Sequence, residues 1–92
     1  MTYTVYILYS SSFDKIYIGF TSNLLKRYQS HNFLATKGWT IKFRPWQVIY
    51  CEYFEDKTVA LRREIALKSQ KYRQRIRSNI NTMYPSNGFI SV

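Results

Sequence analysis

Four polar side chains, those of Tyr17, Arg27, His31 and Glu64, provide a phenol, a guanidinium, an imidazole and a carboxylate. Arg27 and His31 lie four positions apart, so on a helix both project from the same face. A carboxylate can hold one Mg²⁺ through water molecules, an arginine can clamp a phosphate, and a histidine or tyrosine can orient or deprotonate water. The set is too small for a metal cage, but it suits the hydrolysis of a phosphodiester.

Each of these residues also has a plainer interpretation. Tyr6 and Tyr17 are of a type that commonly packs within strands, and Arg27 is typical of a solvated helix surface. Glu64 would suit an ion pair within its own helix. The one histidine would equally suit a surface or capping position. Chemistry therefore requires a fold that brings these side chains together.

The hydrophobic pattern of the first third of the sequence predicts a hairpin followed by a helix. Strand-forming residues fill 3–9 and 16–20, and turn residues separate the two segments. Tyr17 and Gly19 then share one face of the sheet, where the absent glycine side chain leaves room for a neighbour. Helical spacing follows and is expected to stop at Asn32. Three residues are candidates for its N-cap: Thr21, Ser22 and Asn23.

The remainder of the sequence predicts one more strand and two more helices. Residues 33–45 are expected to be irregular, residues 46–54 to form the strand, and Asp56 or Thr58 to cap the second helix. A very basic third helix runs to about residue 80. The order predicts a small α+β fold, a three-stranded antiparallel sheet flanked by about three helices. We expect one domain over 1–81 and a loosely ordered tail over 82–92.

The charge balance favours a polyanionic partner. Lys and Arg together number 14 against 5 Asp and Glu, which gives a net charge of +9. Nucleic acid is the expected partner, most simply DNA, and no base-reading motif is recognisable, so we expect weak sequence preference. A solvated basic surface and an acidic protein partner are the alternatives, and an anionic membrane surface is a weaker one. The predicted nucleic-acid contacts are Lys26, Lys37, Lys42, Arg44, Arg63, Lys68 and Lys71.

Cysteine usage and apolar segment length indicate a reducing, cytoplasmic compartment without a membrane. The single Cys51 cannot form an intrachain disulfide or a thiolate zinc cluster. The longest apolar segments are of strand length, far short of the roughly 20 residues that a bilayer requires. Residues 1–9 lack the pattern of a secretory signal. We expect a monomer.

Four motifs, taken in order, resemble the GIY-YIG nuclease domain, and more narrowly its short single-domain bacterial members. They are "VYI" at 5–7, "YIG" at 17–19, "LLKRYQSHN" at 24–32 and "ALRREIALK" at 60–68. The resemblance covers residues 3 to about 75. The ordered set is specific, whereas any one tripeptide would be weak.

The resemblance implies a role for five residues. Tyr6 and Tyr17 would line the site, with one phenol acting as the general base or relaying to it. Arg27 would contact the scissile phosphate, His31 would lie near the nucleophile, and Glu64 would bind a single Mg²⁺ or Mn²⁺. The implied reaction is hydrolysis of DNA that leaves 5′-phosphate and 3′-hydroxyl ends, selective for structure rather than sequence, in a role such as repair or recombination.

Two other classes of function compete with this one. A catalytically weak module that binds nucleic acid would keep the same fold and basic surface. A protein-interaction subunit would use its basic face to dock on an acidic partner. Cleavage assays on varied DNA forms with Mg²⁺ or Mn²⁺ discriminate among the three.

Overall fold

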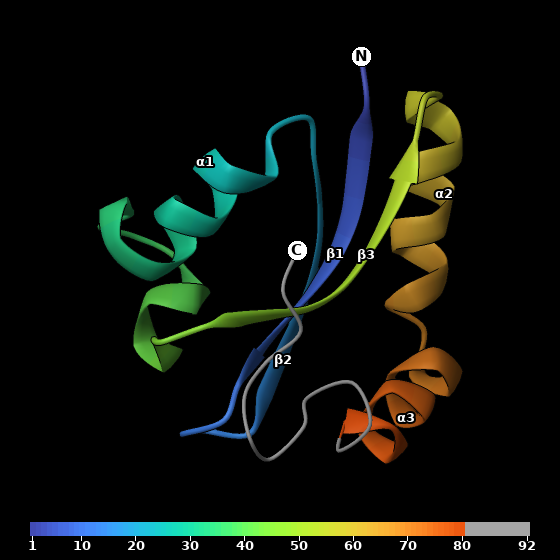
Figure 1. Ribbon diagram of the computed structural model, residues 1–92. Coiled ribbons are helices and arrows are strands. Elements are labelled where there is room, and N and C mark those ends of the chain that lie inside the picture. The colour runs from blue at the N-terminus through green and yellow to red at the C-terminus, as the bar shows by residue number, and fades with distance from the viewer. Residues whose placement is uncertain (81–92) are drawn as a thin grey trace.

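A computed structural model describes residues 1–80 and shows a hairpin extended by a third strand (Figure 1). Strands β1 (Tyr3–Ser10) and β2 (Lys15–Thr21) pair antiparallel, and Tyr6 lies opposite Gly19. Strand β3 (Gln47–Phe54) pairs antiparallel with the other side of β1. The strand order is therefore β2-β1-β3, and the predicted three-stranded antiparallel sheet is confirmed.

A bulge interrupts the alternation of β3. Ile7 lies opposite Tyr50, whereas the next residue, Leu8, lies opposite Val48, so Ile49 is an extra residue on β3. Ile49 and Tyr50 consequently pack on the same face of the sheet. This irregularity decides which side chains of β3 reach each face, and simple alternation does not predict it.

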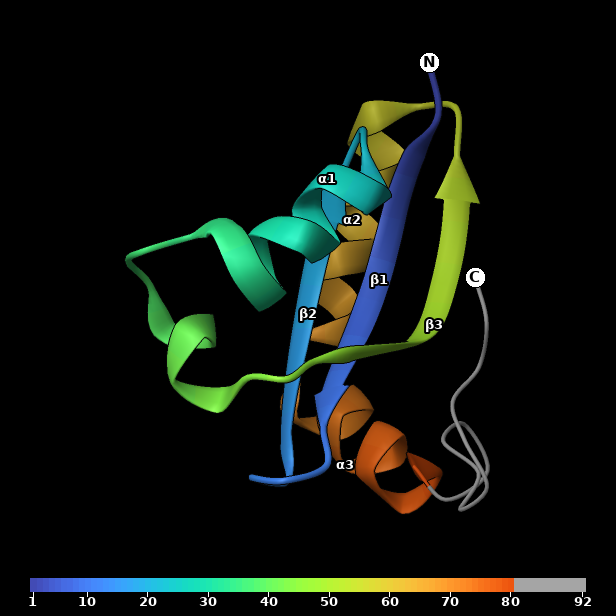
Figure 2. The ribbon, with the colours of Figure 1, turned by 60° about the vertical axis from the view of Figure 1, so that its left-hand side comes forward.

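Helices cover both faces of the sheet. Helix α1 (Leu24–Gln29) packs on one face and α2 (Lys57–Leu67) on the other, with α3 (Gln70–Ser78) beyond the end of α2 (Figure 2). The cap of α1 is Asn23, whose side chain accepts from the backbone N–H of Lys26. Asp56 caps α2 in the same way. Of the candidate caps, Asn23 and Asp56 are thus the ones used.

The connection from α1 to β3 differs from the prediction. The chain does not leave the helical path at Asn32 but continues as a π-helix over Ser30–Leu34, and Trp39–Phe43 form a 3₁₀ helix. Asn32 is buried, and its amide accepts from the backbone N–H of Trp46 at 2.5 Å and donates to the Trp46 carbonyl at 2.8 Å. Asn32 is therefore not a helix stop, because its side chain fastens the connection to the start of β3.

Two apolar layers result, one on each face of the sheet. On the α2 side, Val5, Ile7 and Ile18 pack with Ala60 and Leu67 of the helix. On the α1 side, the buried residues are Tyr6, Leu8, Trp46 and Val48, and Leu24 and Tyr28 of α1 pack against them.

None of the helices within residues 1–80 is long and apolar enough to cross a membrane. The predicted tail, 82–92, lies outside the described residues, as does residue 81.

Candidate active site

A chain of hydrogen bonds links the sheet to the connection that follows α1. The Tyr6 hydroxyl lies 3.0 Å from Nε2 of His31, and Nδ1 of the same ring lies 3.0 Å from Oγ1 of Thr40. All three residues are buried. The chain's only histidine is thereby fixed at both ring nitrogens, at the junction of α1 and the π-helical turn.

Tyr17 lies against this chain. Its ring centroid is 4.6 Å from that of His31 and 6.2 Å from that of Tyr6. Gly19 makes the arrangement possible, because a β-carbon there would lie 2.5 Å from Cζ of Tyr6 and closer still to its hydroxyl. The glycine of "YIG" is thus required by the close approach of the Tyr6 ring, as its position beside Tyr17 led us to expect.

An open hollow of about 380 Å³ exposes part of this cluster to solvent. Tyr17 and His31 line it, together with Arg27 of α1 and Lys37 and Trp39 of the connection. Arg27 is exposed, whereas Tyr6 is fully buried beneath its neighbours. A phosphate entering the hollow would therefore meet Tyr17 and Arg27 before any contact with Tyr6.

The local electrostatics keep both members of the buried pair neutral. Burial, together with the nearby Tyr17, raises the pKa of the Tyr6 phenol well above its usual value, although the Arg27 guanidinium opposes that shift. Burial also lowers the pKa of His31, and the charges of Arg27 and Arg44 act in the same direction. Near neutral pH the site holds a phenol and an uncharged imidazole.

These protonation states assign the direction of the hydrogen bonds. A buried phenol needs an acceptor, and His31 Nε2 is the acceptor placed against Tyr6. The Tyr6 hydroxyl therefore donates to Nε2, and the protonated Nδ1 of His31 donates to Thr40 Oγ1. His31 thus holds Tyr6 in place. Both of its ring nitrogens are engaged, so neither is free to take a proton directly from water.

Glu64 reaches the region from the other side of the sheet. It lies on α2, its side chain is 17% exposed, and its carboxylate pairs with Lys68 at 3.4 Å. Its charge is close enough to contribute to the raised pKa of Tyr6. Three of the five predicted site residues line the hollow, namely Tyr17, Arg27 and His31, and Tyr6 lies buried behind them. Glu64 does not line it, so its approach to a substrate there stays a prediction.

The donor set for a metal ion is small. Within residues 1–80 no group of three or more His, Cys, Asp and Glu side chains lies together. A mostly buried carboxylate paired with an ammonium group, as at Glu64, suits an ion such as Mg²⁺ that keeps most of its water ligands. It does not suit Zn²⁺, which requires three or four protein ligands.

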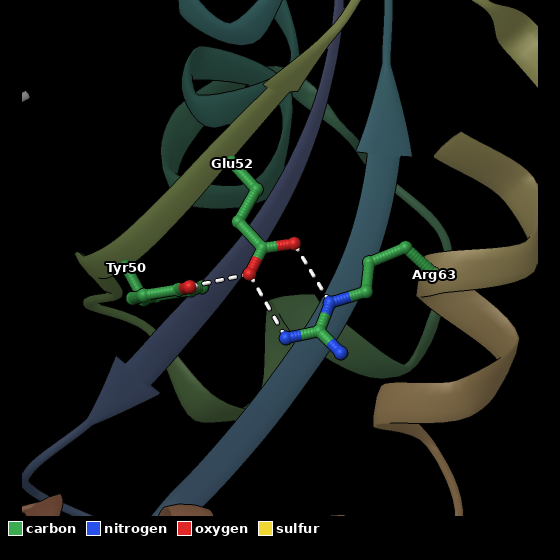
Figure 3. Close-up of polar contacts among 3 residues, drawn as sticks. All are labelled: Tyr50, Glu52 and Arg63. Carbon is green, nitrogen blue, oxygen red and sulfur yellow. Dashed lines mark hydrogen bonds and ion pairs between the residues drawn. The ribbon is translucent and has the colours of Figure 1, made fainter. Parts of the chain in front are cut away.

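The two arginines among the predicted nucleic-acid contacts have side chains engaged within the fold. Arg44 donates to the carbonyls of Ser30, His31 and Ala35, which closes the connection around the π-helical turn. Arg63 forms a two-pronged ion pair with Glu52 of β3, and Tyr50 donates to the same carboxylate (Figure 3). Hydrogen bonding to Arg63 holds the pKa of Glu52 below its usual value. Both arginines are therefore left out of the surface proposed below.

The other predicted contacts are exposed lysines, of which Lys37 lines the hollow. Lys26 and Lys37 lie on α1 and on the connection, and Lys42 lies on the 3₁₀ helix. Lys68 and Lys71 lie at the junction of α2 with α3.

Sequence reasoning missed Thr40 and Trp39. Thr40 orients His31, and Trp39 stacks beside Tyr17 with ring centroids 6.5 Å apart. Both belong to the segment that was expected to be irregular. The signal available was the mixture of aromatic and basic residues in "TKGWTIKFRPW", which indicated contacts but not which residue makes them.

Comparison with known proteins assigns the class. The sequence model described as the GIY-YIG catalytic domain matches residues 2–78. The chain therefore belongs to the GIY-YIG family, a family of nucleases, and the expectation drawn from the four motifs is confirmed.

The relatives are small proteins named UPF0213. The chain is 37% identical over 75 residues to a UPF0213 protein of Limosilactobacillus reuteri, covering 79% of this chain and 77% of that protein. It is 42% identical over 74 residues to one of Lactiplantibacillus plantarum, covering 74% and 68%. The solution NMR structure of the UPF0213 protein BH0048 from Bacillus halodurans superposes with a TM-score of 0.52 at 25% identity, covering 85% and 84%. These names specify no activity.

Substituting Gly19 by Ala is expected to lower the free energy of unfolding by about 1–3 kcal/mol, the usual cost of overfilling a packed site. The added carbon collides with the buried Tyr6 ring, which cannot swing into solvent. Urea denaturation measures the effect. In a Tyr6→Phe background the hydroxyl is gone, so the same substitution should cost less. An equal cost in both backgrounds would show that the Tyr6 hydroxyl adds nothing to the collision.

Acidification is expected to destabilise the protein through His31. Because the pKa is lowered in the folded state, the unfolded chain takes up the proton first as the pH falls through about 6.5. The free energy of unfolding should then fall by at most about 1.4 kcal/mol per pH unit, until the pH reaches the lower folded-state pKa. Denaturation between pH 7 and 5 measures the slope. A His31→Gln variant, which has no histidine, should be flat over this window, and an equal slope in both proteins would contradict the assignment.

Proposed function

We propose that the protein is a metal-dependent endonuclease that hydrolyses phosphodiester bonds in DNA. The observation that carries the proposal is the convergence of Tyr17, Arg27 and His31 on one open hollow, with Tyr6 hydrogen-bonded behind them. This convergence joins β2, α1 and the π-helical turn, with β1 behind them, and supplies the groups that the hydrolysis needs. A net charge of +9 supports a polyanionic substrate.

The geometry suggests separate roles for the two tyrosines. Tyr17 lines the hollow and is the phenol that would orient the attacking water. Tyr6 is fully buried and would act through its neighbours as a positioning residue. His31 packs against Tyr17 and fixes its ring. In the reaction, water adds its oxygen to phosphorus, the bond to the 3′-oxygen breaks, and the 3′-oxygen takes up a proton.

Arg27 and a metal ion held by Glu64 would offset the negative charge of the phosphate. Arg27 stands exposed at the hollow, where its guanidinium can bind two phosphate oxygens and stabilise the charge that develops on them. Glu64 would hold Mg²⁺ or Mn²⁺ mainly through water. Such an ion, when bound, neutralises charge on the phosphate and the leaving oxygen. Lys26, Lys37 and Lys42 would bind flanking phosphates without reading sequence, which favours selection by DNA structure.

The test is a cleavage assay with single-stranded, duplex, flapped and branched DNA of unrelated sequences. The wild-type protein is expected to cleave at least one form with Mg²⁺ or Mn²⁺, and not with EDTA. Tyr17→Phe deletes only a hydroxyl and should slow cleavage about 10²-fold or more. Its thermal unfolding should be matched to that of the wild type first. Cleavage at the wild-type rate by folded Tyr17→Phe, or no cleavage of any form, would overturn the proposal.

A further inference from the structure

A second hollow, of about 360 Å³, passes round the free edge of the sheet. It runs along β2, the edge strand, where Ile16 and Ile18 face α2 while Tyr17 faces α1. Its lining residues are Ile16, Tyr17, Ile18, Trp39, Lys68 and Arg73. Because Tyr17 and Trp39 also line the first hollow, the two spaces are neighbours that share one aromatic wall.

Trp39 is a partly exposed ring in this wall, held in place by contacts with three other aromatic rings. Its side chain is 46% exposed, whereas the other tryptophan, Trp46, is fully buried. The Trp39 ring contacts Phe43 at 4.7 Å and Trp46 at 5.8 Å between centroids, and it stacks on Tyr17 at 26° between the ring planes. An indole supported by three rings loses little side-chain entropy when a further ring stacks on it.

The far side of the second hollow is cationic. Lys68 and Arg73, at the junction of α2 with α3, are both exposed. Nε of Arg73 donates to the Lys68 carbonyl at 3.1 Å, which anchors the guanidinium beside Lys68. An aromatic platform facing a pair of cations is the arrangement that binds a base together with the phosphate beside it.

We propose that Trp39 stacks on an unpaired base of the nucleic acid, and that Arg73 and Lys68 bind the phosphate of that single-stranded segment. The inference rests on the proposed function and deepens it, because it names the form of the substrate. Bases inside a duplex are stacked on one another and do not offer a free face. The preferred substrate is therefore one with an unpaired stretch next to the cleaved bond, such as a flap, an overhang or a single strand.

The experiment measures binding in EDTA, so that no cleavage occurs, and uses tryptophan emission as the probe. Oligothymidylate should quench the exposed Trp39, whereas a duplex of equal length should quench it little. In Trp39→Phe the emission comes from the buried Trp46 and should not respond to the same oligonucleotide. Trp39→Ala should weaken single-strand binding about 10-fold, as expected when one stacking ring is lost, with a smaller change for duplex.

A pair of arginine variants isolates the cationic side. Arg73→Gln should weaken single-strand binding, whereas Arg62→Gln, an exposed α2 arginine outside the hollow, should change it little. Equal effects of the two, equal quenching by duplex, or no quenching at all would overturn the inference. Selective quenching without any cleavage would support this inference and reject the nuclease, and cleavage without quenching would do the reverse.

Discussion

Replacing Glu64 by Gln is expected to reduce cleavage at least about 10³-fold while leaving DNA binding unchanged or slightly tighter. The substitution keeps the shape of the side chain and removes the one carboxylate proposed to hold the metal ion, which costs several kcal/mol of transition-state stabilisation. The negative charge beside the phosphate is also lost, which favours binding in the ground state. Single-turnover rates and a filter-binding or anisotropy assay measure the two effects separately.

Glu55→Gln is the matched control for this prediction. Glu55 is exposed and lies just before α2, and its substitution by Gln changes the net charge by the same amount. It should leave the rate close to that of the wild type. The Lys68 partner of Glu64 is largely solvated, so losing that ion pair should cost little stability. Wild-type cleavage by correctly folded Glu64→Gln would remove the proposed metal site.

Arg27→Ala is expected to lower the rate of cleavage about 10²- to 10³-fold, the usual effect of deleting one electrostatic stabiliser. In the proposed reaction the guanidinium would contact the phosphate in the ground state and more strongly as charge develops, so the loss of rate should exceed the loss of affinity. Rates at saturating DNA, compared with dissociation constants in EDTA, separate the two losses.

Lys26→Ala provides the comparison, because it removes a neighbouring exposed cation from the same helix. It should weaken binding, more so at low salt, and leave the saturated rate nearly unchanged. If the two variants lose rate and affinity in the same proportion, Arg27 is one more phosphate contact and not a transition-state stabiliser.

The strands could be predicted from the sequence, and two helix caps could be narrowed to a few candidates, because their signals are local. The β-branched and aromatic segments define β1 and β2, and Asn23 and Asp56 precede apolar spacing in the way that caps do. The site is less local. Tyr6 meets His31, 25 residues away, and Gly19, 13 residues away. The order of the motifs, rather than their spacing, indicated that these residues meet.

The connection between α1 and β3 could not be predicted, because tertiary contacts decide its structure. Asn32 favours a helix end by propensity, yet its two hydrogen bonds to Trp46 carry it past that position into the π-helical turn. The sequence predicts Arg44 as a nucleic-acid contact, whereas in the structure its guanidinium donates to three backbone carbonyls. For a cationic residue in an irregular segment, the sequence offers no signal that separates one that hydrogen-bonds within the fold from one that binds nucleic acid.

The π-helical turn places His31 and Asn32 side by side, and both are buried. One holds the tyrosine behind the hollow, and the other ties the segment to Trp46. With Arg44 closing the opposite side, these hydrogen bonds fasten residues 30–46 into a clasp between α1 and the start of β3. Release of that clasp would withdraw the imidazole from Tyr6 while every strand of the sheet stayed paired. On heating, we therefore expect the proposed site to come apart before the sheet melts.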